Sequence, residues 1–515
     1  MENVYDHVII GGGTAGAVLA ARLSEDPDVR VALLEAGAGE GPAAMSDADP
    51  VAAIGLWGSP VDWNYRTLPQ AGTENTVHIW PRGRVLGGSS SINGMIHLRG
   101  HASSYDAWEN QGAVGWNYRD MLPFLMRSER AEGGDPRFRG QEGPMIIEEP
   151  PVAGPLAQSL HDAAADAGFP RCADGNAPGA EGVFWAERNV VGGRRQSAAD
   201  AYLLPVLSRR NLKVVTDAQV RRLVIDNGRC VGAEYVRDGR ARTVRAEREV
   251  VLSAGTVGSP QLLMLSGIGP ADHLRQIGIQ VRADLPGVGA NLHDHPLAWI
   301  SYGVKKSPVP GSSRQAMLLT RTGQGGDPDI LMSFTSVALK PRWEGGQEGF
   351  SILFALATPA SRGSVRLRGA DPYSHPLIDP AYLAEGGDVD RMVTALRMAR
   401  HIARADALSV WRGDEILPGG EVDTDDECRA YVRHTAGTYF HPVGTCRIGT
   451  DSESVVDTAL RVHGIDGLRI ADASVMPSIV SANTNAAVLG IAERAAHLIA
   501  TQALFAGQPS AAPHG

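Results

Sequence analysis

The chain has 515 residues, of which 43% are hydrophobic and 21% are charged. This composition excludes a generally disordered protein, and the length is enough for several domains with large cores. Lys and Arg number 48 against 58 Asp and Glu, so the net charge is −10 and nucleic acid is not expected as a partner. The sequence has no run of about 18 apolar residues and no basic, cleavable leader, which predicts a cytoplasmic protein without a membrane span.

Cysteine and histidine spacing predicts neither a disulfide framework nor a metal site. The four cysteines lie far apart in the sequence, which is typical of reduced thiols. His293 and His295 flank Asp294, but no further ligands stand at metal spacing. We therefore expect no bound metal.

Residues 6–35 predict a strand, a glycine-rich turn, a helix and a second strand, which together form a βαβ unit. The turn has the pattern G-x-G-x-x-G, whose glycines let backbone N–H groups approach a pyrophosphate at the helix N-terminus. Glu35 ends the second strand, where its carboxylate is placed to accept hydrogen bonds from both ribose hydroxyls. The unit predicts bound FAD or NAD, against the simpler alternative of a tight turn without a ligand.

The following elements, in chain order, suggest more strands of one sheet and a second, strand-rich domain. Residues 41–71 predict a long irregular segment, and residues 83–94 place glycines and serines around Asn93, which suits a backbone pressed against a flat ring. Residues 247–255 and those from 468 onward again predict a strand that leads into a turn. Between them, residues 301–354 alternate apolar strands with turns, and residues 389–405 have helical spacing.

Several of these motifs occur together with others farther along the chain. Residues 255–269 are rich in Gly, Ser and Leu, His441 begins the run HPVGT, and Asp472 and Asn483 lie in two further short motifs. With this set of motifs in this order, the chain resembles the glucose-methanol-choline (GMC) family of FAD oxidoreductases over about residues 5–500. His97 departs from the family pattern, which indicates an individual flavin-side pocket.

The resemblance implies the GMC fold, which is α/β with a Rossmann-like FAD-binding domain and a second α+β, strand-rich substrate-binding domain. The expected FAD-binding domain is discontinuous and comprises residues 1–155, 200–297 and 435–505. The substrate-binding domain then comprises residues 156–199 and 298–434, and residues 506–515 form a flexible tail.

The resemblance also implies the residues that bind FAD. The expected contacts are Gly11, Gly13, Thr14, Ala15, Gly16, Glu35, Arg84, Val85, Asn93, Gly94, Met95, Ile96, Val220, Ala471, Asp472 and Thr484. In several relatives a histidine of the residue 83–94 loop carries the flavin covalently, and Ile92 stands at that position here. FAD is therefore expected to be noncovalent. For Asp472, a helix N-cap is the alternative interpretation.

His441 and Asn483 are the expected catalytic residues. An imidazole with an ordinary pKa near 6.5 can accept an alcohol proton near neutral pH, and the family position of Asn483 hydrogen-bonds the substrate oxygen. A helix that begins at Asn485 would place its positive end beside reduced flavin. The simpler alternatives are a surface or core histidine and a helix that only packs.

The expected substrate is a neutral primary alcohol, either aryl, furan or aliphatic, which is oxidised to the aldehyde with electrons passing to O2 or another acceptor. Candidate pocket residues are Trp63, Leu297, Ser333, Tyr439 and Phe440, although core packing also explains single aromatics. Leu297 stands where choline-acting relatives place a glutamate, and Ser333 stands where a family histidine is found. A quaternary ammonium substrate would lack its charge partner.

Other activities stay open from sequence alone. The family also contains hydroxynitrile lyases, light-driven fatty-acid decarboxylases and choline-type dehydrogenases. A nicotinamide dehydrogenase would share the first 35 residues, but it would not need the later flavin loops. The sequence leaves the oligomeric state open.

Overall fold

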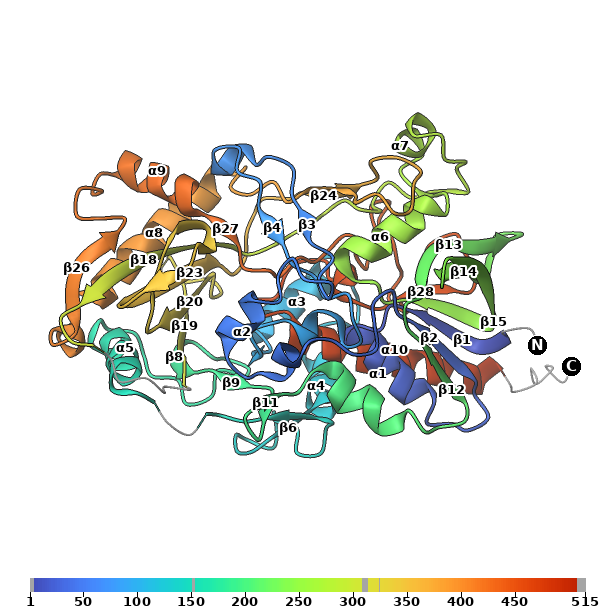
Figure 1. Cartoon of the computed structure of the whole chain (residues 1–515), viewed down its shortest axis with the longest axis horizontal. Helices are drawn as coiled ribbons and strands as arrows, with labels where there is room; N and C mark the ends of the chain where they lie inside the picture. The colour runs from blue at the N-terminus through green and yellow to red at the C-terminus, as the bar shows by residue number, and fades with distance from the viewer. Residues whose placement is uncertain (1–3, 151–152, 308–313, 324, 507–515) are drawn as a thin grey trace, which may run out of the picture.

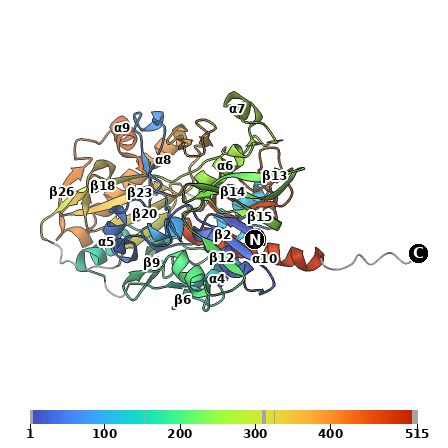
Figure 2. The same cartoon turned by 45° about the vertical axis from the view of Figure 1, so that its right-hand side comes forward.

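The structure is a computed structural model that describes residues 4–150, 153–307, 314–323 and 325–506. It contains two seven-stranded sheets, which lie toward opposite ends of the molecule's long axis (Figures 1 and 2). Across the described ranges, no helix combines the length and apolar character that a membrane span requires.

The first sheet is mostly parallel and forms the core of the cofactor end. Its strand order is β12 (Leu212–Val215), β2 (Val31–Leu34), β1 (Val4–Ile10), β15 (Arg240–Leu252), β14 (Arg229–Arg237) and β13 (Gln219–Asp226), with β28 (Leu468–Ile470) also paired to β15. All four residues of β2 are buried, as expected for a parallel strand covered on both faces. Strands β14 and β13 extend the sheet with antiparallel pairing.

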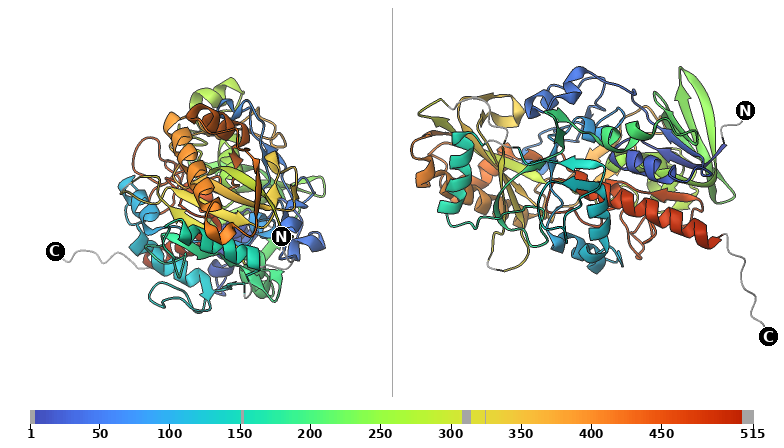
Figure 3. Two further views of the ribbon diagram at one scale, coloured as in Figure 1. Left: turned by 90° about the vertical axis from the view of Figure 1, so that its left-hand side faces the viewer. Right: turned by 90° about the horizontal axis from the view of Figure 1, so that it is seen from below.

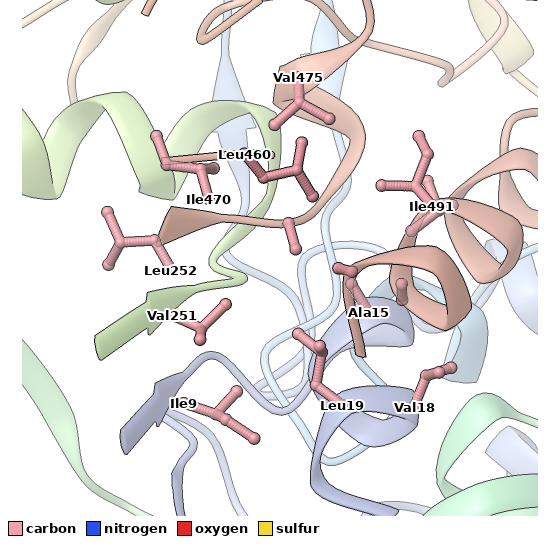
Figure 4. Close-up of a cluster of buried hydrophobic side chains, with 14 of the residues drawn as sticks. Ile9, Ala15, Val18, Leu19, Val251, Leu252, Leu460, Ile470, Val475 and Ile491 are labelled. Atoms are coloured by element: carbon pink, nitrogen blue, oxygen red, sulfur yellow. The ribbon is translucent and has the colours of Figure 1, made fainter. Parts of the chain in front are cut away.

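Two helices that begin at the same edge of this sheet pack together. Helix α1 (Thr14–Leu23) follows β1, and α10 (Asn485–Ala506) comes from the far end of the chain. Figure 4 shows Ala15, Val18 and Leu19 of α1 between the strands and Ile491 of α10. The buried small residues of α1 allow this close approach, and both helix N-termini are thereby brought side by side.

The second sheet is antiparallel. Its order is β26 (Arg412–Leu417), β18 (Pro296–Val304), β23 (Phe350–Leu356), β20 (Ile330–Thr335), β19 (Ala316–Thr320) and β8 (Gly182–Trp185), with β27 (Gly437–Thr438) also paired to β18. Helices α8 (Gly386–Ala403) and α5 (Pro155–Asp166) pack against one face through a separate apolar core (Figure 3). Residues of the opposite face line the cavity described below.

Shorter elements connect and cover the sheets. The other α-helices are α2 (Pro50–Ile54), α3 (Ala102–Asn110), α4 (Tyr118–Ser128), α6 (Gly255–Leu265), α7 (Ala271–Gln276) and α9 (Asp425–Thr435). The short strand pairs are β3 (Tyr65–Arg66) with β4 (Ile79–Trp80), β5 (Ile96–His97) with β9 (Glu187–Arg188), β6 (Glu129–Ala131) with β7 (Met145–Ile147), β10 (Val190–Val191) with β11 (Arg194–Arg195), β16 (Ile268–Gly269) with β17 (Ala283–Asp284), β21 (Ala338–Leu339) with β22 (Gly346–Gln347), and β24 (Ser364–Arg366) with β25 (Leu377–Asp379).

The predicted division into domains stays a proposal. The strands of each sheet fall within the expected ranges, except that β27 and the start of β18 lie in the ranges assigned to the FAD-binding domain while pairing in the second sheet. Ala506, the first residue of the predicted tail, is the last residue of α10. The rest of that tail, residues 507–515, lies outside the described residues.

Candidate active site

A cavity of about 770 Å³ runs from the first sheet to the second. Its floor is formed by the carboxyl ends of β1 and β2 and by the starts of α1, α6 and α10, while its far wall comes from β20, β23 and the residues around β21 and β27. A crevice at the carboxyl ends of parallel strands is the usual ligand site of an open α/β sheet.

The glycine-rich turn leaves backbone amides of α1 open to this cavity. Gly13 caps α1, and no side chain accepts a hydrogen bond from the first turn. Gly88 has φ +54, and a Cβ added there would lie 2.7 Å from Gly13 Cα, so a side chain would close the gap between two loops. A helix N-terminus with free N–H groups binds phosphate, and Thr14 and Ala15 line the cavity at this point.

Glu35 lies at the end of β2 with both carboxylate oxygens already engaged. Oε2 accepts a hydrogen bond from Gly12 N and Oε1 accepts one from Gly37 N, both at 2.7 Å. Burial raises the pKa of Glu35 to about 7, and the two amides oppose that rise. Each oxygen has a second lone pair, so Glu35 can hold this turn and still accept from a ribose hydroxyl.

The loop of residues 83–96 lines the middle of the cavity. Arg195 holds this loop from behind, because its Nη1 donates to the Asn93 carbonyl at 2.6 Å and to Asn93 Oδ1 at 2.8 Å. Met95 has φ +65, an uncommon conformation for a residue with a side chain, and a Cβ added at Gly94 would meet no atom within 4 Å. Ile92 also lines the cavity and has no atom that could bond to a flavin.

Asp472 lies at the cavity wall, and its side chain organises two turns. Oδ2 accepts hydrogen bonds from Gly255 N at 2.9 Å and Ser259 Oγ at 2.6 Å, and Oδ1 accepts from Ser474 N at 2.8 Å. The capping interpretation therefore describes its observed contacts. Its predicted contact with FAD stays a proposal.

Four predicted site residues lie behind the cavity wall rather than on it, namely Gly16, Val85, Ala471 and Leu297. Gly16 is where α1 contacts the preceding turn, because an added Cβ would lie 1.9 Å from the Gly11 carbonyl oxygen. Leu297 pairs with Ala355 and is 1% exposed, because Tyr439 and Trp343 pack over its cluster. The other predicted residues all line the cavity.

His441 and Asn483, which are 42 positions apart, meet in the cavity wall. Asn483 Nδ2 lies 3.1 Å from His441 Nε2. A third residue completes the group, because His295 Nδ1 lies 3.0 Å from His441 Nδ1, and His295 Nε2 lies 3.2 Å from the Ala357 carbonyl oxygen. Sequence reasoning named His295 only as part of a rejected metal pair.

This chain of contacts determines which ring nitrogen of His441 carries the proton. The Ala357 carbonyl can only accept, so His295 Nε2 carries a hydrogen. Burial lowers the pKa of His295 to about 4, so the ring is neutral near pH 7 and its Nδ1 accepts from His441 Nδ1–H. Neutral His441 then has a bare Nε2, to which the Asn483 amide donates.

Charge and burial keep His441 neutral. Burial, the neighbouring His295 ring and the Arg82 guanidinium lower the pKa of His441 well below its usual value. Arg82 also lines the cavity, and its Nη2 donates to the Phe440 carbonyl at 2.7 Å. The Arg82 charge favours negative charge developing nearby.

Asp294 fixes the backbone that presents His441. Its Oδ1 accepts from His441 N at 2.8 Å, and its Oδ2 accepts from Thr438 Oγ1 at 2.5 Å and from the Tyr382 hydroxyl. Phe440, just before His441, has φ +65. This network holds the uncommon backbone that turns the imidazole toward the cavity.

The second-sheet side of the cavity combines aromatic rings with a few polar groups. The Trp57 and Phe440 ring centroids are 4.8 Å apart, and those of Trp343 and Phe440 are 5.9 Å apart. Trp63 also lines the cavity, and its ring centroid lies 5.0 Å from Cζ of the Arg84 guanidinium. Ser333 and Tyr439 also lie on the wall.

Comparison with known proteins identifies the family. Two models described as GMC oxidoreductase match the chain, one over residues 5–297 and the other over residues 359–492. The chain belongs to the GMC oxidoreductase family. This GMC oxidoreductase is 39% identical to the mitochondrial choline dehydrogenase of Mus musculus, over 97% of this chain and 90% of the relative. It is also 39% identical to the oxygen-dependent choline dehydrogenase of Rhizobium johnstonii, over 97% and 96% of the two chains.

Solved structures agree with this assignment. Pyridoxine 4-oxidase from Mesorbium loti superposes with a TM-score of 0.92 at 38% identity, covering 96% of this chain and 99% of the other. A fungal aryl-alcohol oxidase superposes with a TM-score of 0.87 at 25% identity, covering 98% and 100%. The predicted fold class is confirmed, and this GMC oxidoreductase is an FAD-dependent enzyme that acts on alcohols.

The cavity is suited to FAD. The open amides of α1 suit the diphosphate, and Glu35 suits the adenosine ribose. Residues 92–96 line the cavity with open space at Gly94, which leaves room for the ring system. The N-terminus of α10 points into the same space, where Thr14 Oγ1 donates to Asn485 Oδ1 at 2.8 Å. Among the described residues, no cluster of His, Cys, Asp and Glu could hold a metal ion.

Proposed function

We propose that this enzyme oxidises a neutral primary alcohol to the aldehyde, with His441 as the base and Asn483 as the donor to the substrate oxygen. The observation that carries the proposal is the 3.1 Å contact between Asn483 Nδ2 and the bare Nε2 of His441 at the cavity wall. The lone pair of His441 Nε2 and the N–H donor of Asn483 lie side by side. An alcohol group could therefore donate its hydrogen to His441 and accept a hydrogen bond from Asn483 at the same place.

The alcohol would replace the direct contact between the two side chains. Its O–H donates to His441 Nε2, while Asn483 Nδ2–H donates to the alcohol oxygen. His441 takes the proton as negative charge develops on that oxygen, and Arg82 and Asn483 stabilise the charge. Bound FAD supplies the acceptor for the hydride that leaves the carbinol carbon.

The proposed FAD site uses the cavity-lining residues of the predicted set. Gly11, Gly13, Thr14 and Ala15 would contact the diphosphate, and Val220, which also lines the cavity, would contact the adenine. Asn93, Gly94, Met95, Ile96, Asp472 and Thr484 would surround the flavin, with Arg84 near the same loop. We propose that FAD is bound noncovalently. Ile92 stands where several relatives have a flavin-bonded histidine, and its side chain has no atom that could form such a bond.

Charge in the cavity supports a neutral substrate. Among the described residues the acidic lining consists of Glu35, Asp62 and Asp472, and each accepts hydrogen bonds from backbone amides. Asp62 Oδ2, for example, accepts from Gly58 N at 2.8 Å. A cationic substrate would therefore find no uncommitted carboxylate on this wall, and it would meet the positive charge of Arg82.

A choline-type activity is the second candidate. The three rings of Trp57, Trp343 and Phe440 contact one another, and such an aromatic group can bind a quaternary ammonium ion by cation–π attraction. The choline dehydrogenase relatives favour the same possibility. Choline therefore belongs in the substrate test.

The test is anaerobic reduction of the purified, FAD-loaded enzyme. Benzyl, furfuryl, linear alkyl and choline substrates are mixed in turn with the protein, bleaching of the flavin band is followed, and air is then admitted. We expect bleaching by a neutral alcohol, with His441→Ala lowering the rate by about 100- to 10,000-fold while FAD stays bound. Fast reoxidation in air would indicate O2 as the acceptor, and slow reoxidation would indicate another acceptor.

A matched control separates catalysis from a general effect of losing a histidine. His401 on α8 is exposed, so His401→Ala should bleach at the wild-type rate. Near wild-type bleaching by His441→Ala would refute the base assignment. Bleaching by no alcohol would favour a hydroxynitrile lyase or a photodecarboxylase, which release cyanide from a cyanohydrin or carbon dioxide under light.

A further inference from the structure

A buried arginine lies behind the loop of residues 83–96 and forms no ion pair with a carboxylate of the described residues. Arg195 ends β11 and is 6% exposed. Its Nε donates to the Met45 carbonyl at 2.8 Å, and its Nη1 donates to the Asn93 carbonyl at 2.6 Å and to Asn93 Oδ1 at 2.8 Å. Within the described ranges its buried Nη2 has no partner. The guanidinium charge is therefore surrounded by uncharged acceptors.

A second buried arginine adds to this charge. Arg188 in β9 is also buried, and its Nη2 donates to the Ala48 carbonyl and lies 3.8 Å from Met95 Sδ. Three exposed carboxylates attract the two guanidinium groups, namely Asp47, Asp49 and Asp200. Because water screens exposed carboxylates, a net positive charge remains in the interior behind the cavity wall.

Arg195 also determines how Asn93 presents its amide to the cavity. Asn93 Oδ1 accepts from Met95 N at 3.0 Å as well as from Arg195 Nη1. Asn93 lines the cavity, and Nδ2 is the end of its amide that remains for a ligand. A guanidinium that draws electron density toward Oδ1 polarises the amide, which makes Nδ2–H a stronger donor.

We propose that Arg195 is a positioning residue that favours the reduced form of bound FAD, by turning and polarising the Asn93 amide toward the flavin and by its own buried charge. In the proposed reaction the alcohol loses a hydride to FAD and a proton to His441, so one negative charge is added at the cofactor. A polarised N–H donor and a positive charge in the interior both stabilise that added charge. Arg188 contributes its charge in the same direction. This inference rests on the proposed function for the position of the flavin beside residues 93–96.

The test is the two-electron reduction potential of bound FAD, measured against a reference dye with a chemical reductant and without any alcohol. Arg195→Gln removes the charge but keeps an amide that can donate to Asn93. We expect the ratio of Kd for oxidised FAD to Kd for reduced FAD to fall about 10-fold, which lowers the potential by about 30 mV. Arg195→Lys keeps the charge and should retain most of the wild-type potential. Arg188→Gln should lower the potential by a smaller amount.

Arg194 provides the matched control, because it precedes Arg195 on the same strand and is exposed. Arg194→Gln should leave the potential unchanged, since water screens its charge. A wild-type potential in Arg195→Gln would overturn the inference. A potential in Arg195→Lys as low as in Arg195→Gln would also overturn it, because the shape of the loop rather than the charge would then be responsible.

Two further comparisons keep the outcome decisive. If Arg195→Gln does not retain FAD, Arg188→Gln decides, and a wild-type potential in that variant overturns the inference. Failure of the proposed function looks different, because the potentials would still differ among the variants while no alcohol bleached the flavin.

Discussion

Replacing His295 by leucine is expected to slow alcohol oxidation although His295 does not line the cavity. His295 Nδ1 is the acceptor for His441 Nδ1–H, and both rings are buried. Without it, a buried N–H loses its partner, which costs about 1–3 kcal/mol. The alternative tautomer, with the hydrogen on Nε2, avoids that cost because the Asn483 amide can turn its oxygen toward Nε2. The reactive tautomer, with the hydrogen on Nδ1 and a bare Nε2, then falls in population about 5- to 150-fold, since 1.36 kcal/mol corresponds to a tenfold change in an equilibrium constant.

The assay is the anaerobic rate of flavin reduction by the best alcohol, at matched FAD content. His295→Asn is the conservative partner variant, because an amide oxygen can accept from His441 Nδ1–H, and it should recover most of the rate lost in His295→Leu. The ¹⁵N chemical shifts of His441 should show a bare Nε2 in the wild type and a protonated Nε2 in His295→Leu. A leucine variant with the wild-type rate and an unchanged ¹⁵N spectrum would refute the tautomer argument.

Three further predictions follow from the site. Because the pKa of His441 lies well below 6.5, the acid limb of the kcat/KM pH profile should fall below pH 6.5, and a limb at or above that value would contradict the buried, neutral base. Glu35→Ala leaves the amides of Gly12 and Gly37 without their acceptor, so the ratio of FAD to protein after purification should drop, and Glu35→Gln, which keeps one oxygen, should drop less. Leu297→Glu places an unpaired carboxylate in an apolar cluster and should lower Tm strongly. A rise in the Tm of this variant on adding choline would show instead that position 297 reaches the substrate.

The cofactor end of the fold was predictable because its signals are local. Strand, glycine turn, helix and acidic residue lie within residues 6–35, and each step follows from backbone conformation or strand burial. The helix predicted over residues 389–405 forms as α8, and the one predicted from Asn485 forms as α10. His441 could be chosen as the candidate base among 15 histidines only because it begins the run HPVGT. A single histidine produces no periodic sequence pattern that would mark it as catalytic.

The parts that sequence reasoning missed depend on contacts between distant segments. His295 meets His441 across 146 positions, and Arg195 holds Asn93 across 102 positions. Leu297 lies on the strand face that is turned toward the cavity, but Tyr439 and Trp343 cover it. The alternation of a strand predicts the face on which a residue lies, but it does not predict whether other side chains separate that residue from the cavity.

A lowered pKa makes His441 a weaker base, and the same group of residues offsets that weakness. Arg82 lowers the pKa of His441 through its charge, yet the charge also favours the anionic oxygen that forms when the proton leaves. His295 keeps accepting from Nδ1–H after Nε2 gains the proton, and a hydrogen bond from a charged donor is stronger than one from a neutral donor. Both contacts therefore act on charge that develops as the proton moves, and an interaction that is stronger in the transition state than in the ground state lowers the barrier.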